Sequence, residues 1–180
     1  LLNTALVRAQ TACCAAMDMA LNGYRDLGTL EADFVAMFQA EWRLQRPQQQ
    51  LRTIAIVDDA PAQQYLAPEF QLFKHLFTQH GLHAVVADAA ELRLVDGALM
   101  HGDTAIDMVY NRVTDFDLSE PAHAALAQAY ASGAAVVTPN PHVHALRADK
   151  RHLVTLGQAA ALQALGASHD DIATLGISVP

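Results

Sequence analysis

A short apolar run, Thr53-Ile54-Ala55-Ile56-Val57, ends directly at two aspartates, Asp58 and Asp59. The run is rich in β-branched residues and does not alternate with polar ones. Such a segment predicts a strand that is buried on both faces, as in a parallel sheet. A strand of that kind needs a layer of helices on each side. This one segment therefore restricts the chain to the α/β class of folds.

Helix and strand patterns alternate after this first strand. Pro68 opens a helical pattern that His80-Gly81 closes, and four of its apolar residues share one face: Phe70, Phe73, Leu76 and Phe77. Further strands are predicted over 83–87, 106–110 and 134–137, with a hairpin at Asp96-Gly97 and an Ala-rich helix over 121–132 that Gly133 stops. This order predicts an open, mainly parallel, Rossmann-like sheet flanked by helices.

The first 46 residues predict two helices ahead of the sheet. In the second helix an apolar stripe recurs at helical spacing after Thr29, a candidate N-cap: Leu30, Phe34, Met37, Phe38 and Trp42. The polar segment from Arg46 to Gln50 predicts a linker. The stripe can pack on the α/β domain, on a second copy in a homodimer, or on a partner protein, and packing into a core is the commonest of these.

The strand pattern stops after Thr138-Pro139-Asn140-Pro141. Residues 145–165 are predicted to be mostly helical, and residues 176–180 read as the start of another strand. The chain is therefore expected to consist of N-terminal helices over 1–46, an α/β domain over 51–144 and the start of a further domain over 145–180.

The composition excludes some classes of partner. Eleven Lys and Arg against nineteen Asp and Glu give a formal charge of −8, and no basic stripe is present, so we expect neither nucleic-acid nor anionic-membrane binding. Cys13 and Cys14 are adjacent on a predicted helix and point apart, which disfavours a structural disulfide. With no visible signal peptide and no apolar run near ~18 residues, a cytoplasmic location is expected.

Polar residues follow every predicted core strand: Asp58-Asp59, Asp88, Asn111-Arg112 and Thr138-Pro139-Asn140. In open parallel sheets, ligands bind outside these carboxyl ends. The guanidinium fork of Arg112 can hold a carboxylate or phosphate through two hydrogen bonds, unless it pairs with Asp115 or Asp117.

Several familiar site motifs are absent from the sequence. It contains no phosphate loop, no GxGxxG after the first strand and no GxSxG elbow. His142 and His144 offer two metal ligands from one loop, but no third ligand stands at a recognisable spacing, so no metal site is predicted.

The order of these segments resembles the pre-ATP-grasp domain of ATP-grasp ligases, such as glutathione synthetase-like and D-alanine–D-alanine ligase-like enzymes. It is most similar to glutathionylspermidine synthase-like and circularly permuted ATP-grasp proteins. The resemblance covers about residues 51–155 and rests on these segments: Ile56 to Asp59, Pro68-Glu69-Phe70, Asp96-Gly97, Ile106 to Arg112, Thr138 to Pro141 and Ala148 to Arg151.

The resemblance implies an activity and a set of site residues. Family members use ATP and Mg²⁺ to convert a carboxylate into an acyl phosphate, which an amine or a thiol then attacks. By resemblance, Lys150 contacts a nucleotide phosphate, whereas the substrate side of the cleft is lined by Asp58, Asp59, Asn111, Arg112 and Asn140. The second ATP lysine, the phosphate-covering loop and the magnesium ligands are expected beyond Pro180, so no catalytic residue is expected within these 180 residues.

Two other classes of protein fit parts of the sequence. Asp58 and Asp59 after the first strand, with Thr138 after a later one, are typical of a signalling receiver domain. However, Asn111 and Arg112 stand where a receiver needs its phosphoacceptor aspartate, and Lys150 lies in helical sequence. The other alternative is a non-enzymatic interaction module in which the N-terminal helices bind a partner.

Overall fold

The computed structural model describes residues 1–14, 16 and 27–178. Its helices are α1 (Leu2–Cys13), α3 (Leu27–Gln45), α4 (Ala67–Gln79), α5 (Ala124–Ser132), α6 (Pro141–Arg147), α7 (His152–Leu156), α8 (Ala159–Ala164) and α9 (His169–Ser178). Its strands are β1 (Thr53–Asp58), β2 (His83–Asp88), β3 (Leu92–Val95), β4 (Ala98–His101), β5 (Thr104–Ile106), β6 (Met108–Asn111) and β7 (Val136–Thr138). Three short 3₁₀ helices are η1 (Pro61–Gln63), η2 (Ala89–Glu91) and η3 (Pro121–His123). The chain forms two compact units, Leu1–Asn140 and Pro141–Pro180.

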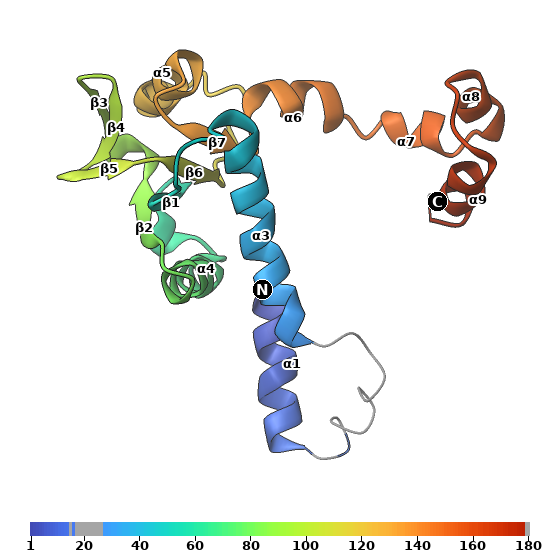
Figure 1. Ribbon diagram of the computed structural model, residues 1–180, viewed down its shortest axis with the longest axis horizontal. Helices are drawn as coiled ribbons and strands as arrows, with labels where there is room; N and C mark the ends of the chain where they lie inside the picture. Colours follow the sequence, from blue (N-terminus) through green and yellow to red (C-terminus); the bar gives the residue numbers. More distant parts are fainter. Residues whose placement is uncertain (15, 17–26, 179–180) are drawn as a thin grey trace. The chain divides into compact units, whose positions relative to one another are not determined.

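The first unit is built on a parallel four-stranded sheet. The strand order is β2-β1-β6-β7, and every neighbouring pair is parallel (Figure 1). β1 lies inside the sheet, and its residues from Ile54 to Val57 are fully buried. This confirms the α/β fold with a parallel sheet and preceding helices that the apolar run at 53–57 predicts.

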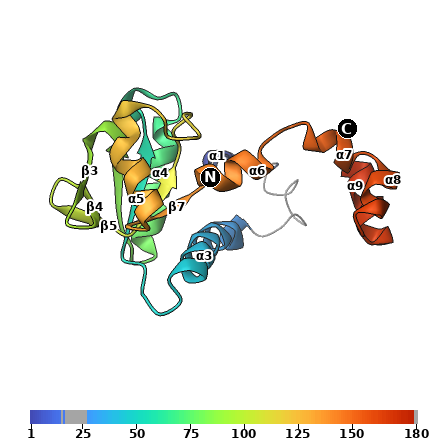
Figure 2. The same ribbon diagram turned by 90° about the horizontal axis from the view of Figure 1, so that it is seen from above.

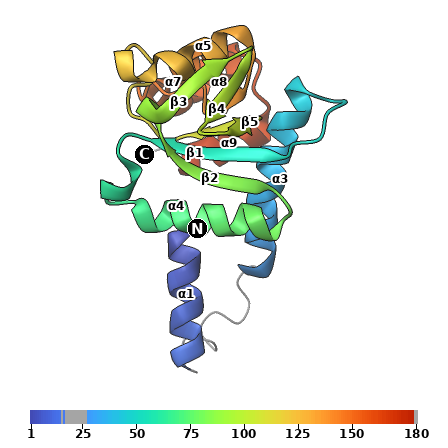
Figure 3. The same ribbon diagram turned by 90° about the vertical axis from the view of Figure 1, so that its left-hand side faces the viewer.

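Successive residues of β1 face opposite sides of the sheet and join two separate cores. Ile54 and Ile56 belong to a cluster formed with α3 and α4. Ala55 and Val57 belong to a second cluster formed with α5 and the strands that follow β2. Figure 3 shows α4 and α5 on opposite sides of the sheet. The prediction of helices on both faces is confirmed.

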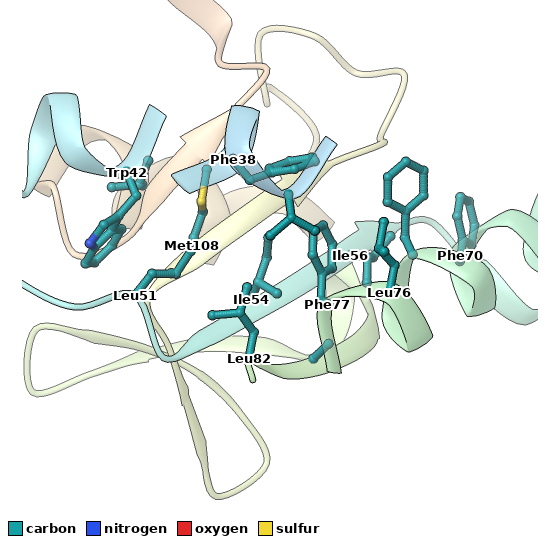
Figure 4. Close-up of a cluster of buried hydrophobic side chains, with 14 residues drawn as sticks. Phe38, Trp42, Leu51, Ile54, Ile56, Phe70, Leu76, Phe77, Leu82 and Met108 are labelled. Carbon is teal, nitrogen blue, oxygen red and sulfur yellow. The ribbon is translucent and has the colours of Figure 1, made fainter. Parts of the chain in front are cut away.

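The helix α3 completes the first core. Phe38 is 2% exposed, and its ring makes edge-to-face contacts with Phe77 and Tyr110 at centroid distances of 5.0 and 4.9 Å. Trp42 is buried in the same cluster and donates its indole N–H to the Gln49 carbonyl at 2.7 Å. Figure 4 shows Phe38, Trp42 and Phe77 together with Ile54 and Ile56 of β1. Within the stripe, Phe34, Phe38 and Trp42 therefore pack on the α/β domain, as the commonest of the three alternatives, whereas Met37 is 55% exposed.

Three antiparallel strands form a second, smaller sheet in the order β3-β4-β5 (Figures 1 and 2). The hairpin predicted at Asp96-Gly97 is confirmed as β3 and β4. Asp96 and Gly97 have φ values of 49° and 79°, as a tight two-residue turn between twisted strands requires. The third strand, β5, was not predicted.

The core strand predicted over 106–110 is confirmed only from Met108, where β6 begins. Ile106 ends β5 of the small sheet, and Met108 begins β6 of the parallel sheet. Between them, Asp107 accepts hydrogen bonds from the backbone N–H groups of Arg52 and Thr53, both at 2.9 Å. One carboxylate thus fixes the chain at the point where it passes from one sheet to the other.

Two predictions about helix ends are also wrong. Thr29 lies within α3, which begins at Leu27, and so does not cap it. Residues 176–178 are helical rather than the start of a strand, because α9 runs to Ser178; residues 179 and 180 lie outside the described residues. The start of α9 is fixed by a capping box: Ser168 accepts from the Asp171 N–H at 3.1 Å, and the Asp171 carboxylate accepts from the Ser168 N–H at 3.3 Å.

The second unit consists of α6 to α9. Leu162 of α8 is buried within it. Among the helices of the described residues, none is both long and apolar enough to cross a lipid bilayer.

Candidate functional site

The carboxyl ends of the four parallel strands lie at one edge of the central sheet. β1 ends at Asp58, β2 at Asp88, β6 at Asn111 and β7 at Thr138. From β1 the chain passes to β2 on one side, and it later returns to β6 on the other side. The point between β1 and β6 is therefore the topological switch point, where open α/β sheets bind their ligands.

Arg112 stands beside this switch point. Its backbone N–H donates to the Val57 carbonyl of β1 at 2.8 Å, which fixes its position against the first strand. Its guanidinium donates to the Tyr110 hydroxyl at 2.9 Å and lies over the Tyr110 and Phe70 rings, 5.5 and 5.8 Å from their centroids. Glu69 of α4 is its ion-pair partner at 3.7 Å, a loose contact. From the sequence, Asp115 or Asp117 was considered as the ion-pair partner of Arg112. In the structure that partner is Glu69.

Asp58 is the most buried acid at this edge, with 9% exposure. One of its carboxylate oxygens accepts from the Asp59 N–H at 2.9 Å. Burial raises the pKa of Asp58 above its usual value, and the nearby charges of Asp59 and Asp88 raise it further, whereas the Asp59 N–H and the Arg112 charge oppose the rise. Asp58 and Arg112 therefore share one electrostatic environment.

Asp59 is part of a three-residue network that the sequence did not predict. Its carboxylate lies 2.7 Å from one ring nitrogen of His123, and the other ring nitrogen lies 2.7 Å from Asp115. His123 is fully buried, whereas the Asp59 side chain is 46% exposed. The contact joins residues that are 64 positions apart, so no local sequence signal marks it.

The two asparagines expected at the site bond to neighbouring segments, Asn111 to the loop after β7 and Asn140 to helix α5. Asn111 donates to the Pro139 carbonyl at 3.3 Å and accepts from the Val113 N–H at 3.2 Å. Asn140 accepts from the Tyr130 hydroxyl at 3.4 Å. The Thr138–Pro139 peptide bond, which directly precedes Asn140, is cis. Both amides lie at the carboxyl edge, where they hold the loops after β6 and β7.

Lys150 belongs to the second unit, in the turn between α6 and α7, and its side chain is exposed. Its neighbour Asp149 accepts from the Arg151 N–H at 2.8 Å and from the Arg151 guanidinium at 2.7 Å. The hydrogen bonds from Arg151 lower the pKa of the Asp149 carboxyl. The acidic residue of the Asp149-Lys150 pair thus orders the turn, and the lysine ammonium projects from an ordered segment.

An open hollow of about 530 Å³ is lined in part by the residues that follow Asp59 in the chain. It is lined by residues of η1, the start of α4 and β2: Pro61, Ala62, Ala67, Pro68, Gln71 and Val86. Its volume is in the range of small-molecule sites. Among the described residues, no three His, Cys, Asp or Glu side chains are grouped so that they could hold a metal ion.

No protein-family model matches this chain, and no curated protein matches it significantly.

The arrangement at the carboxyl edge divides the charges by strand. The ends of β1 and β2 carry the carboxylates of Asp58, Asp59 and Asp88, whereas the ends of β6 and β7 carry a guanidinium and two amides. A ligand with a carboxylate at one end and an amine at the other, or two separate ligands of these kinds, would meet complementary groups here.

Proposed function

We propose that this chain is the substrate-binding α/β domain, with the start of the following domain, of a cytoplasmic ATP-dependent ligase that joins a small carboxylate to an amine or a thiol. The observation that carries the proposal is the position of Arg112 beside Asp58 at the switch point between β1 and β6. The resemblance of residues 51–155 to pre-ATP-grasp domains supports the same function.

In this proposal Arg112 binds the substrate carboxylate. Its guanidinium is held by the Tyr110 hydroxyl and by the two aromatic rings, so its position does not depend on the loose Glu69 contact. A substrate carboxylate can take the place of Glu69 and form two parallel hydrogen bonds, which is the geometry that a guanidinium favours. The carboxylates of Asp59 and Asp88 then attract the amine that is to be joined.

ATP with Mg²⁺ would supply the phosphoryl group that activates the carboxylate. Of the nucleotide contacts that the resemblance implies, these residues provide Lys150, whose exposed ammonium suits a phosphate.

The proposal is tested with the full-length protein that contains this sequence. We expect Mg-ATP-dependent release of ADP that requires both a carboxylate and an amine or thiol from a panel of small metabolites. Replacing Lys150 with alanine should weaken ATP binding at least about tenfold, because a charge-assisted hydrogen bond contributes about 1.5–3 kcal/mol. Lys74→Ala, which removes an exposed lysine from α4, is the matched control. An unchanged ATP dissociation constant in Lys150→Ala removes this residue from the site.

Glu69→Gln should strengthen carboxylate binding. Glu69 competes with a substrate carboxylate for Arg112, and a partly exposed ion pair contributes up to about 1 kcal/mol. We therefore expect the dissociation constant for succinate, used as a carboxylate probe in calorimetry, to fall about two- to fivefold. Glu91→Gln removes the same charge from a pair with His101 on the small sheet and should have no such effect. Weaker succinate binding in Glu69→Gln would contradict the competition.

A further inference from the structure

His123 lies between two carboxylates that come from different segments of the first unit. Asp59 follows β1, and Asp115 lies in the loop that follows β6. Each carboxylate has an oxygen 2.7 Å from one ring nitrogen of His123, and the ring has no exposed surface. The imidazole therefore bridges the ends of two neighbouring strands at the switch point.

Two such short contacts determine how many protons the ring carries. A neutral imidazole has one N–H and one bare nitrogen, whereas an ionised carboxylate can only accept hydrogen bonds. Asp115 is held ionised by further donors: the Glu120 N–H at 2.8 Å and the Ser119 hydroxyl at 3.2 Å. With both carboxylates ionised, both ring nitrogens must carry a proton, and His123 is an imidazolium.

The surroundings of the ring favour that charge. Burial lowers the pKa of His123, but the hydrogen bonds and charges of Asp59 and Asp115 outweigh burial and raise it above the ordinary 6.5. Hydrogen bonds to Asp115, first that from the Glu120 N–H, hold the pKa of that carboxyl well below its usual range. The other charged groups on the elements around the ring are mostly acidic: Asp58, Asp88, Glu91, Asp117, Glu120 and Arg112.

We propose that His123 is a positioning residue of the candidate site: as an imidazolium it fixes the half-exposed Asp59 carboxylate at the mouth of β1, and loss of one ring proton releases it. The role of Asp59 in binding an amine rests on the proposed function, but the positioning of the Asp59 carboxylate by His123 does not. The backbone of Asp59 is held separately, because its carbonyl accepts from the Gln64 amide at 2.7 Å. The histidine is thus the contact that fixes the side chain.

The test is ¹⁵N NMR of the histidine rings in this chain across the pH range. We expect both ring nitrogens of His123 to be protonated at pH 6, with a titration midpoint above 6.5. Asp59→Asn should lower that midpoint by about one pH unit, since it removes one of two adjacent opposite charges. Asp96→Asn makes the same change at the β3–β4 turn and should leave the midpoint in place.

The sign of the pH dependence is fixed by the raised pKa. A group whose pKa is higher in the folded than in the unfolded protein stabilises the fold below its unfolded value, here about 6.5, and that contribution is lost as the pH rises through the folded value. Three-bond couplings that report the χ1 angle of Asp59, measured by NMR, should become averaged over the same pH range, whereas amide protection within β1 and β6 persists. His123→Gln should remove this step.

Three results would overturn the inference. The first is a single protonated ring nitrogen at pH 6, and the second is an equal midpoint in the wild type and Asp59→Asn. The third is a χ1 angle of Asp59 that does not follow the His123 titration, because the ring would then be charged without positioning the Asp59 side chain. The first two measurements need neither a folded His123 variant nor a substrate, so they stand whether or not the protein proves to be a ligase.

Discussion

Replacing Phe38 with alanine should lower the free energy of unfolding by about 3–5 kcal/mol, the range for removing a fully buried phenylalanine. The Phe38 ring contacts Phe73 of α4, Phe77 of α4 and Tyr110 of β6, so its loss opens a cavity where three elements meet. The surrounding rings cannot close that cavity without leaving their own edge-to-face contacts. Thermal and urea unfolding of this chain measure the effect.

Met37→Ala is the matched control, because Met37 neighbours Phe38 on α3 but is 55% exposed. Its effect should remain within about 0.5 kcal/mol. Limited proteolysis adds a second readout: α3 should resist cleavage in the wild type and in Met37→Ala, and become sensitive in Phe38→Ala. Equal stability of the two variants would contradict the packing of α3 on the sheet. It would favour the alternative in which the N-terminal helices bind a partner protein.

Arg112→Ala should weaken binding of the carboxylate by at least about 30-fold, because truncating one partner of a hydrogen-bonded charge pair costs about 2–5 kcal/mol. The fold should persist, since the Arg112 backbone N–H, which bonds to Val57, is retained. Calorimetry with succinate on this chain, and the Michaelis constant for the carboxylate in the full-length protein, measure the loss.

Two further variants isolate the cause of that loss. Arg112→Lys keeps the charge but not the planar fork, so it should recover only part of the affinity. Arg93→Ala removes an exposed guanidinium from β3 and should leave binding unchanged. Unaltered succinate affinity in Arg112→Ala, with a folded protein, would remove the observation on which the proposed function rests.

Much of the fold was predictable because its strongest signals are local. The apolar run at 53–57, the aromatic face of the helix that Pro68 opens and the Asp96-Gly97 turn each reflect short-range geometry, and each is confirmed. Strand order was beyond this reasoning. It follows from which faces the connecting segments cover, and single strands do not carry that information.

Two of the misses have different origins. Asp107 interrupts the stretch from Ile106 to Tyr110 because it binds the backbone of Arg52 and Thr53, which lie 55 and 54 positions away. The Ser168–Asp171 capping box marks the start of α9, and the helix then continues through Gly176, although glycine is unfavourable inside helices.

The candidate site was predictable in part. The rule that parallel strands present their carboxyl ends at one edge places Asp58, Asn111 and Arg112 together, as the sheet order now specifies. This rule does not predict that His123 belongs to the site. A histidine near the start of a helix carries no such signal, and only the fold brings Asp59 and Asp115 to its ring. Nor does the rule determine that the Asn111 amide would donate to the Pro139 carbonyl or that the Asn140 amide would accept from the Tyr130 hydroxyl of α5.

The two faces of β1 differ in the size of their side chains, and this difference assigns each helix to its own side. The larger Ile54 and Ile56 meet the aromatic rings of α3 and α4, whereas the smaller Ala55 and Val57 meet the alanine-rich α5. A shift of β1 by one residue would exchange these sets, leaving voids under the phenylalanines and crowding α5. The six residues of this strand thus specify which helix layer packs on which face, and any redesign that replaces α4 or α5 must replace the matching face of β1 with it.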